Sequence, residues 1–195
     1  MKRKVIALTG KIGSGKSAVS AILRDMGYKT VDCDVLAKQV ADNPDVVKRV
    51  EQLLGSKSVE NGQLNRKYIR EVVFSDADLH EKYEQIFFDG VKELLVANIA
   101  NLQKNIAMKA NQAIFVEIPV LDAFSFTWDE IWRVESSEKA CISRVTARDK
   151  VPAESVCATL NRQKIYDCTY VIENNGDLKQ LEQSVKRALT KSELL

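Results

Sequence analysis

The sequence predicts an α/β fold, with a parallel five-stranded sheet that has helices on both faces. The first observation is alternation, because short apolar runs of strand length are followed by longer segments of helical pattern. Such alternation is typical of βαβ units, which build a parallel sheet. The second observation is the position of residues that terminate helices and strands, since Gly27, Gly55 and Pro119 each end a predicted element. Strands are therefore expected at residues 5–9, 29–32, 113–118, 131–135 and 170–173.

Helices are expected in the segments that lie between and after these strands. Their ranges are 16–26, 35–41, 45–54, 66–74, about 77–109, 138–148, a segment that begins at Pro152, and 177–189. Asn65 is a suitable N-cap for the helix at 66–74, and the polar residues 60–62 are expected to form a turn. The block from about residue 43 to 109 interrupts the alternation, so it is expected to be a helical insertion within a single domain of residues 1–195.

The composition excludes two classes of partner. The chain has 195 residues, of which 45% are hydrophobic and 29% charged, and its formal net charge is +2. Because a nucleic-acid-binding protein usually carries a strongly basic stripe, no nucleic-acid partner is expected. No apolar run approaches the roughly 20 residues that span a bilayer, so no membrane partner is expected either.

The cysteines and the single histidine predict little metal or redox chemistry. The chain has four cysteines without CxxC spacing, so a zinc site is not expected. Free thiols are typical of a reducing compartment, and we expect a cytoplasmic protein. His80 lies among charged residues and is interpreted as a surface residue.

A glycine-rich motif, named the phosphate loop below, directly follows the first predicted strand. It matches G-x-x-x-x-G-K-[ST] with Gly10, Lys11, Ile12, Gly13, Ser14, Gly15, Lys16 and Ser17. The glycines let successive backbone N–H groups converge on an anion, and the helix that begins there adds its positive N-terminal end. Lys16 would neutralise the outer phosphates, and the Ser17 hydroxyl would bind Mg²⁺. The motif predicts an ATP- and Mg²⁺-dependent phosphotransferase, in preference to a glycine turn without a ligand.

Two carboxylates flank Cys33 at the end of the second predicted strand. Residues two apart in a strand point to the same side, so Asp32 and Asp34 are both expected to face the phosphate loop. An ionised aspartate can orient an attacking hydroxyl, take its proton late, or hold water on Mg²⁺. The alternative for either residue is a cap on the next helix. Glu117, which ends the third strand, either supports the Mg²⁺ site or is an ordinary strand-end acid.

Two arginines lie on the helix predicted at residues 138–148. Arg144 and Arg148 are four residues apart, so they share one face of that helix. Such a pair can close over a triphosphate and neutralise the charge of the transition state. The alternative is an ordinary solvated helix face.

The chain resembles the dephospho-coenzyme A kinase family over nearly the whole length of the chain, because several motifs occur in the order and spacing of that family. The first is the phosphate loop itself with the preceding Leu8-Thr9. The others are Val31-Asp32-Cys33-Asp34-Val35-Leu36-Ala37, Leu64-Asn65-Arg66 with Val73-Phe74, Arg144-Val145-Thr146-Ala147-Arg148-Asp149, and Val171-Ile172-Glu173-Asn174-Asn175-Gly176.

The resemblance implies a P-loop nucleotide-kinase-like fold with a core, a helical substrate-side insertion and a small lid at about 138–165. It implies ATP-dependent phosphorylation of the ribose 3′-hydroxyl of dephospho-coenzyme A, with Mg²⁺ as cofactor. Asp34 would be the base, with Lys16 and Arg144 neutralising the transferring phosphate. The binding residues that it implies are the phosphate loop, Arg144, Arg148 and Asn175 for ATP, Asp32, Asp34 and Arg66 for the acceptor, and Ser17 and Asp32 for the metal.

The chain departs from the family pattern at three places. Phe88-Asp89 stand where the family has a His-Pro pair, and residues 119–123 are a reduced form of its P-L-L-F-E element. The segment after Gln163 leads almost directly to Tyr166 and the last strand. These changes fall in the acceptor half and the lid. The alternatives are therefore another nucleoside or nucleotide kinase, or a diverged nucleotide-binding regulator with weak or no kinase activity.

Overall fold

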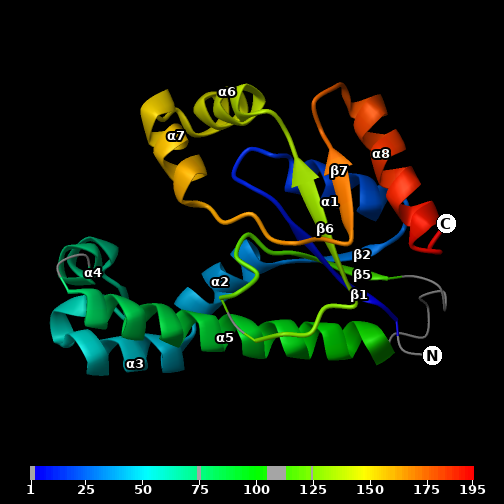
Figure 1. Cartoon of the computed structure of the whole chain (residues 1–195). Helices are drawn as coiled ribbons and strands as arrows, with labels where there is room; N and C mark the ends of the chain where they lie inside the picture. The colour runs from blue at the N-terminus through cyan, green and yellow to red at the C-terminus, as the bar shows by residue number, and fades with distance from the viewer. Residues whose placement is uncertain (1–2, 74–75, 105–112, 124) are drawn as a thin grey trace. The chain divides into compact units, whose positions relative to one another are not determined.

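The computed structural model describes residues 3–73, 76–104, 113–123 and 125–195. It divides into two compact units, of which the first consists of Met1–Asp32 with Ile99–Leu195 and the second of Cys33–Asn98. A parallel sheet with its helices forms the first unit, and helices with a short hairpin form the second (Figure 1).

The sheet of the first unit has five described strands in the order β2-β5-β1-β6-β7, and every pairing is parallel. The strands are β1 (Val5–Thr9), β2 (Lys29–Asp32), β5 (Ile114–Glu117), β6 (Glu130–Glu135) and β7 (Tyr170–Glu173). β1 lies between β5 and β6, so the direction of the strand order reverses at β1. Ligands of open parallel sheets bind outside the carboxyl ends of the strands at such a reversal, and the phosphate loop follows β1 at this point.

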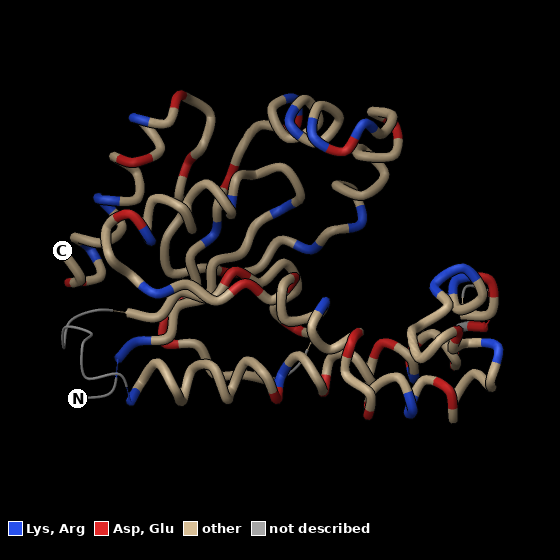
Figure 2. Tube along the Cα trace, turned by 180° about the vertical axis from the view of Figure 1, so that it is seen from behind, with Lys and Arg blue, Asp and Glu red and all other residues tan. Residues whose placement is uncertain are grey.

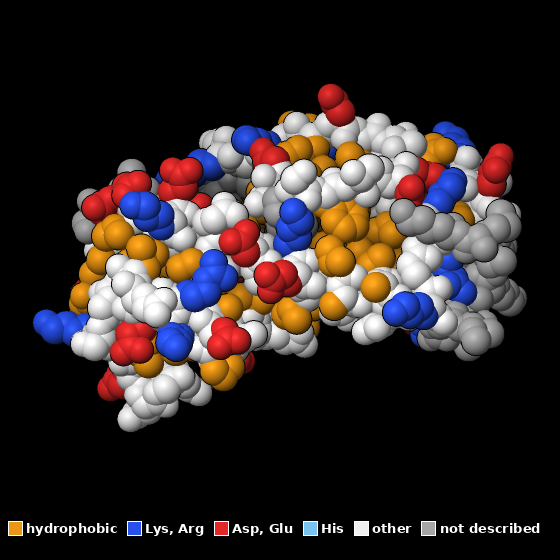
Figure 3. Space-filling model, turned by 90° about the horizontal axis from the view of Figure 1, so that it is seen from below, with side chains coloured by type: hydrophobic (Ala, Val, Ile, Leu, Met, Phe, Trp, Pro, Cys, Tyr) orange, Lys and Arg blue, Asp and Glu red, His pale blue; other side chains and the backbone are white. Residues whose placement is uncertain are grey.

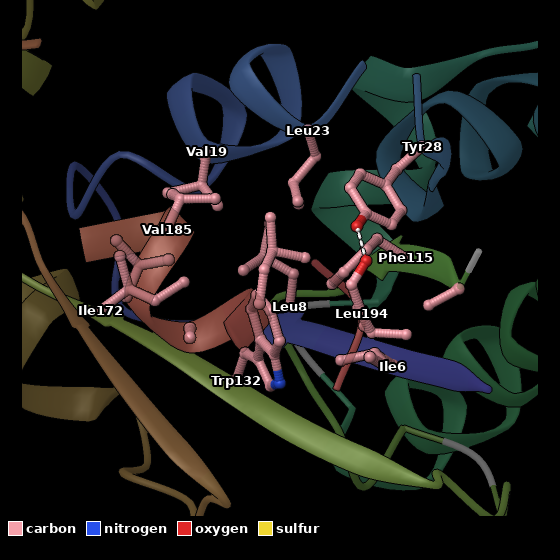
Figure 4. Close-up of a cluster of buried hydrophobic side chains, with 14 of the residues drawn as sticks. Ile6, Leu8, Val19, Leu23, Tyr28, Phe115, Trp132, Ile172, Val185 and Leu194 are labelled. Carbon is pink, nitrogen blue, oxygen red and sulfur yellow. Dashed lines mark hydrogen bonds between the residues drawn. The ribbon is translucent and has the colours of Figure 1, made fainter. Parts of the chain in front are cut away.

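One face of this sheet packs against α1 (Lys16–Asp25) and α8 (Leu178–Lys191). Figure 4 shows Val19 and Leu23 of α1 and Val185 of α8 around Leu8 and the fully buried Trp132. Every residue of β1 and β5 is buried, as expected for parallel strands that are covered on both faces. The predicted fold class, a five-stranded parallel α/β fold, is confirmed.

Two further helices of the first unit form a pair next to the phosphate loop. They are α6 (Glu138–Asp149) and α7 (Ala153–Arg162). Four buried side chains from this pair form a small separate core, against which Ile12 of the loop packs; they are Cys141, Val145, Val156 and Leu160. The pair therefore shares a hydrophobic contact with the loop itself.

The second unit contains three complete helices and most of a fourth. Its elements are α2 (Cys33–Ala41), α3 (Pro44–Leu54), a 3-10 turn (Ser56–Ser58), β3 (Val59–Glu60), β4 (Gln63–Leu64), α4 (Arg66–Val73) and α5 (Ala77–Lys104) up to residue 98. The turn predicted at 60–62 is confirmed, because Asn61 and Gly62 both have positive φ, 52° and 77°, as a tight hairpin turn requires. Asn65 caps α4 as predicted, since its Oδ1 accepts the Tyr68 N–H at 3.1 Å.

The boundaries of two predicted elements need correction. α2 begins at Cys33, so Asp34 lies in its first turn and only Asp32 belongs to a strand. The pairing of the two carboxylates by strand alternation is therefore wrong; an acidic side chain in a first turn is stabilised by the positive end of the helix. Pro152 precedes α7 as its N-cap instead of opening it. Phe74 and the last part of the helix predicted at 77–109 lie outside the described residues.

Charged residues of both signs are interspersed along the described chain (Figure 2). On the face drawn in Figure 3, hydrophobic side chains gather in groups that charged side chains separate. Exposed apolar residues include Val35 and Val96. No helix in the described part of the chain combines the length and the apolar character needed to cross a bilayer.

Candidate active site

The phosphate loop turns sharply between β1 and α1. Gly15 caps α1 with φ 102°, and a Cβ at this position would collide with the side-chain amide of Asn174. Gly13 has φ 75°, and a Cβ there would lie 2.6 Å from the carbonyl oxygen of Cys141 and 2.8 Å from Cγ2 of Val145. The motif leaves position 13 open, so the requirement for glycine there comes from its positive φ and from the close approach of α6.

The ammonium group of Lys16 is held by the first turn of the loop. Its Nζ donates to the carbonyl oxygen of Gly10 at 2.8 Å and lies 3.4 Å from that of Lys11. The Lys11 carbonyl also accepts the backbone N–H of Ser14 at 3.1 Å. The positive charge therefore lies against the loop whose N–H groups bind phosphate in such motifs.

A network of side chains holds the carbonyl groups of the loop from outside. The Ser14 carbonyl oxygen accepts from Asn174 Nδ2 at 2.7 Å, and Ser136 Oγ lies 3.0 Å from it. Arg144 donates to the Gly13 carbonyl at 3.2 Å and, through Nη2, to the Asn174 carbonyl at 2.9 Å. Because these donors occupy the carbonyl oxygens, the peptide planes of the loop are fixed before any ligand binds.

A buried carboxylate supports the serine at the end of the motif. Ser17 donates its hydroxyl to Glu117 Oε1 at 2.8 Å, and Ser20 donates to Oε2 at 2.8 Å. Glu117 is 8% exposed, whereas Ser17 is exposed. Asp32 is the register partner of Glu117 on the neighbouring strand, so both carboxylates lie at the same edge of the sheet. Hydroxyl and carboxylate oxygens are the donors that Mg²⁺ prefers, and this group fits that ion.

The first unit brings together the phosphate loop, Asp32, Arg144 and the segment that contains Asn175. The side chain of Asn175 accepts the backbone N–H of Ser137 at 2.7 Å, at the start of α6. Arg148, on the same helix as Arg144, forms a two-point ion pair with Asp149 and is largely exposed. The predicted i, i+4 placement of the two arginines on one helix is confirmed.

The predicted acceptor residues Asp34 and Arg66 belong to the second unit. Asp34 is exposed in the first turn of α2. Arg66 opens α4 and lines a pocket of about 430 Å³ within this unit, together with Lys38, Arg70 and Tyr83. Burial raises the pKa of Tyr83, and the nearby Arg66 guanidinium opposes this effect. The pocket thus combines three cationic side chains with the carboxylate of Glu84 and the phenol of Tyr83.

The contacts of three residues at the site were not assigned from the sequence: Ser136 was missed, Glu117 was left open, and Asn174 was recognised only as part of the motif that contains Asn175. Glu117 ends β5, and the other two residues directly follow β6 and β7. Their common signal is position, because ligands of parallel sheets bind at the carboxyl ends of the strands. Applying that rule to every predicted strand would have found all three.

A cavity of about 220 Å³ lies beside the loop in the first unit. Gly10, Lys11, Arg133 and Tyr166 are among its lining residues. The hydroxyl groups of Thr9 and Ser14, also in the lining, are buried and have no hydrogen-bond partner within the described residues. Charged side chains such as Lys11 and Arg133 line the space, which suits polar atoms of a ligand or water.

Comparisons with known proteins agree on one family. The family model of dephospho-CoA kinase matches residues 4–180. The dephospho-CoA kinase of Staphylococcus epidermidis is 32% identical over 195 residues, which cover 95% of this chain and 94% of that protein. The Staphylococcus aureus enzyme of the same name is 31% identical, with 95% and 92% covered.

Solved structures share the fold of this chain. TT1252 from Thermus thermophilus superimposes with a TM-score of 0.81 at 29% identity over 98% of both chains. The dephospho-CoA kinase of Campylobacter jejuni has a TM-score of 0.61 at 19% identity over 97% of both chains, a likeness of fold alone. With its phosphate loop, its parallel sheet and a family match over nearly all of its length, the chain belongs to the dephospho-CoA kinase family.

Proposed function

We propose that this kinase transfers the γ-phosphoryl group of ATP to the ribose 3′-hydroxyl of dephospho-CoA in the cytoplasm, giving CoA and ADP. The observation that carries the proposal is the phosphate loop, whose carbonyl groups are held from outside while Lys16 and the Ser17–Glu117 pair line its ligand side. Phosphoryl transfer depends mainly on positioning and charge neutralisation, and this loop supplies both.

Within the first unit, Lys16 neutralises charge on the transferring phosphoryl group. Arg144 adds a second positive charge next to the start of α1, since its Nη1 lies 4.0 Å from where a Cβ of Gly15 would be. The hydrogen bonds of Arg144 to the loop carbonyls fix that charge in place. Arg148 and Asn175 contact the remainder of the nucleotide.

Ser17 and Asp32 would hold Mg²⁺, and Glu117 keeps the Ser17 hydroxyl in position through its 2.8 Å hydrogen bond. When bound, the ion neutralises negative charge on the outer phosphates of ATP. Glu117 is itself kept in place by Ser20, so the support extends into the buried part of α1.

Within the second unit, Asp34 accepts the proton of the attacking hydroxyl and Arg66 binds phosphate of the acceptor. The pocket next to Arg66 supports this role, because Lys38 and Arg70 line it as well. Arg66 and Arg70 lie four residues apart on the short helix α4, and Lys38 lies on α2. Arginine can grip a phosphate through two parallel hydrogen bonds, which suits the diphosphate of dephospho-CoA.

Phe88 and Asp89, which stand where the family has a His-Pro pair, are not among the residues that line the pocket at Arg66. Asp89 accepts a hydrogen bond from Gln85 at 2.8 Å and forms an ion pair with Arg49 at 3.5 Å. Both contacts are exposed, so they contribute little to stability, and they leave the pocket at Arg66 unobstructed. We therefore retain dephospho-CoA as the acceptor.

The test is ADP release at saturating ATP and Mg²⁺ with a panel of dephospho-CoA, nucleosides and nucleotides. Dephospho-CoA should give the highest kcat/KM. Asp34→Asn should lower kcat by about 100-fold or more with little change in the Kd for ATP, since a general base acts mainly in the transition state. Asp32→Asn, its matched control, should act through the Mg²⁺ requirement. A higher kcat/KM for a nucleoside or nucleotide would refute the proposed acceptor.

A further inference from the structure

The chain that follows α7 is attached to the phosphate loop and to the sheet. We name residues 163–166 the strap. At its start, Gln163 Oε1 accepts the backbone N–H of Ile12 at 2.8 Å. At its end, the Tyr166 carbonyl accepts from Arg133, and the Tyr166 hydroxyl donates to Asp122 at 2.7 Å. The strap is therefore held at both ends, and Gln163 is its contact with the loop.

The Ile12 N–H belongs to the same peptide unit as the Lys11 carbonyl. That carbonyl accepts the Ser14 N–H at 3.1 Å and lies 3.4 Å from Lys16 Nζ. Because a peptide unit is planar, fixing the direction of its N–H also fixes the direction of its C=O. The acceptor oxygen of Gln163 thereby orients a carbonyl group that faces Lys16.

We propose that Gln163 is a positioning residue for Lys16, acting through the Lys11–Ile12 peptide plane. This role rests on the proposed function in one respect, namely that Lys16 neutralises charge on the transferring phosphoryl group. The side chain of Ile12 is anchored separately, by the apolar cluster of α6 and α7. Loss of the hydrogen bond should therefore free the peptide plane to rotate without detaching the loop from these helices.

The experiment compares two substitutions of nearly equal length. Gln163→Met keeps the volume of the side chain and removes the acceptor oxygen. Gln163→Glu keeps both the length and an acceptor. Gln52→Met, on the exposed surface of α3, controls for the replacement itself. Amide hydrogen exchange at Ile12 is measured in the free protein, and kcat, the KM for each substrate and the unfolding temperature are measured for each variant.

We expect Gln163→Met to speed exchange at Ile12 by about five- to tenfold, as for the loss of one hydrogen bond, and to lower kcat by a similar factor. The KM for dephospho-CoA and the unfolding temperature should stay near those of the Gln52→Met control. Gln163→Glu should keep slow exchange at Ile12.

Unchanged exchange at Ile12 in Gln163→Met would overturn the proposal. So would a kcat of Gln163→Met equal to that of the Gln52→Met control, because the hydrogen bond would then have no effect on Lys16. The exchange measurement needs no acceptor, so failure of the proposed acceptor, seen as absent turnover in the unsubstituted protein, is distinguishable from failure of this inference.

Discussion

Substitution of Gly13 by alanine tests whether α6 packs against the phosphate loop. The motif pattern leaves this position open and so does not specify the effect of the substitution. The structure predicts a severe one, because the new Cβ would lie 2.6 Å from the Cys141 carbonyl oxygen and 2.8 Å from Val145 Cγ2. Real Cβ atoms essentially never come within 3.0 Å of such atoms, so the backbone of α6 would have to move.

The magnitude has two parts. A non-glycine residue in the left-handed region costs roughly 1–2 kcal/mol, and φ at Gly13 is 75°. Forcing a methyl group into a packed site costs typically about 1–3 kcal/mol more. Gly62 is a matched control, because its φ is 77° and nothing lies within 4 Å of its Cβ position. Gly62→Ala should therefore show the first cost alone.

The assay is denaturant unfolding of both variants, together with the Kd for ATP. Gly13→Ala should be less stable than Gly62→Ala by about 1–3 kcal/mol, and it should bind ATP at least about tenfold more weakly. Gly62→Ala should bind ATP like the unsubstituted protein. Equal unfolding free energies and equal ATP affinities in the two variants would refute the packing of α6 on the loop.

Three further predictions concern charged groups. Lys16→Ala should lower kcat by about 100-fold or more in an ADP-release assay while the circular dichroism spectrum is retained, because one charge meets the transferring group. Glu117→Gln should raise the Mg²⁺ concentration needed for half-maximal rate, measured by titration, since it weakens the acceptor of the Ser17 hydroxyl. Burial would raise the pKa of Glu130, but hydrogen bonds led by that from Lys4 outweigh it and hold the pKa below its usual value. The stability that Glu130 contributes is therefore present above about pH 4.3 and is lost as the pH falls through its folded pKa, so in unfolding measurements Glu130→Gln should be most destabilising near neutral pH and progressively less so as the solution is acidified.

Local features of the sequence predicted the fold well. The five strands were predicted to within one residue at each end, because each is a short apolar run with a clear stop. The turn at Asn61-Gly62 and the cap at Asn65 were predicted because each depends on the chemistry of one or two residues. The kinase family was likewise recognised from motifs in order, and the family match confirms it.

Contacts between distant segments could not be predicted. Asn174 reaches Ser14 across 160 residues of sequence, and Gln163 reaches Ile12 across 151. No local pattern encodes which side chain meets which carbonyl, because that depends on the register of β6 and β7 and on the packing of α7. The start of α2 was misplaced for a related reason, since Cys33 is buried and apolar enough to continue a strand.

The hydrogen bonds around the loop imply that its carbonyl groups and its N–H groups have different roles. The carbonyl groups hold the loop in shape, and the N–H groups bind the phosphates. Donors from Lys16, Asn174 and Arg144 occupy carbonyl oxygens of the loop, and these side chains come from three different parts of the chain. A loop whose carbonyls are already bonded loses little conformational entropy when a triphosphate binds, so its N–H groups are pre-oriented at low cost. Removing an outer donor such as Asn174 should therefore weaken ATP binding before it affects the chemical step. Removing Lys16, which also meets the phosphate, should affect the chemical step first.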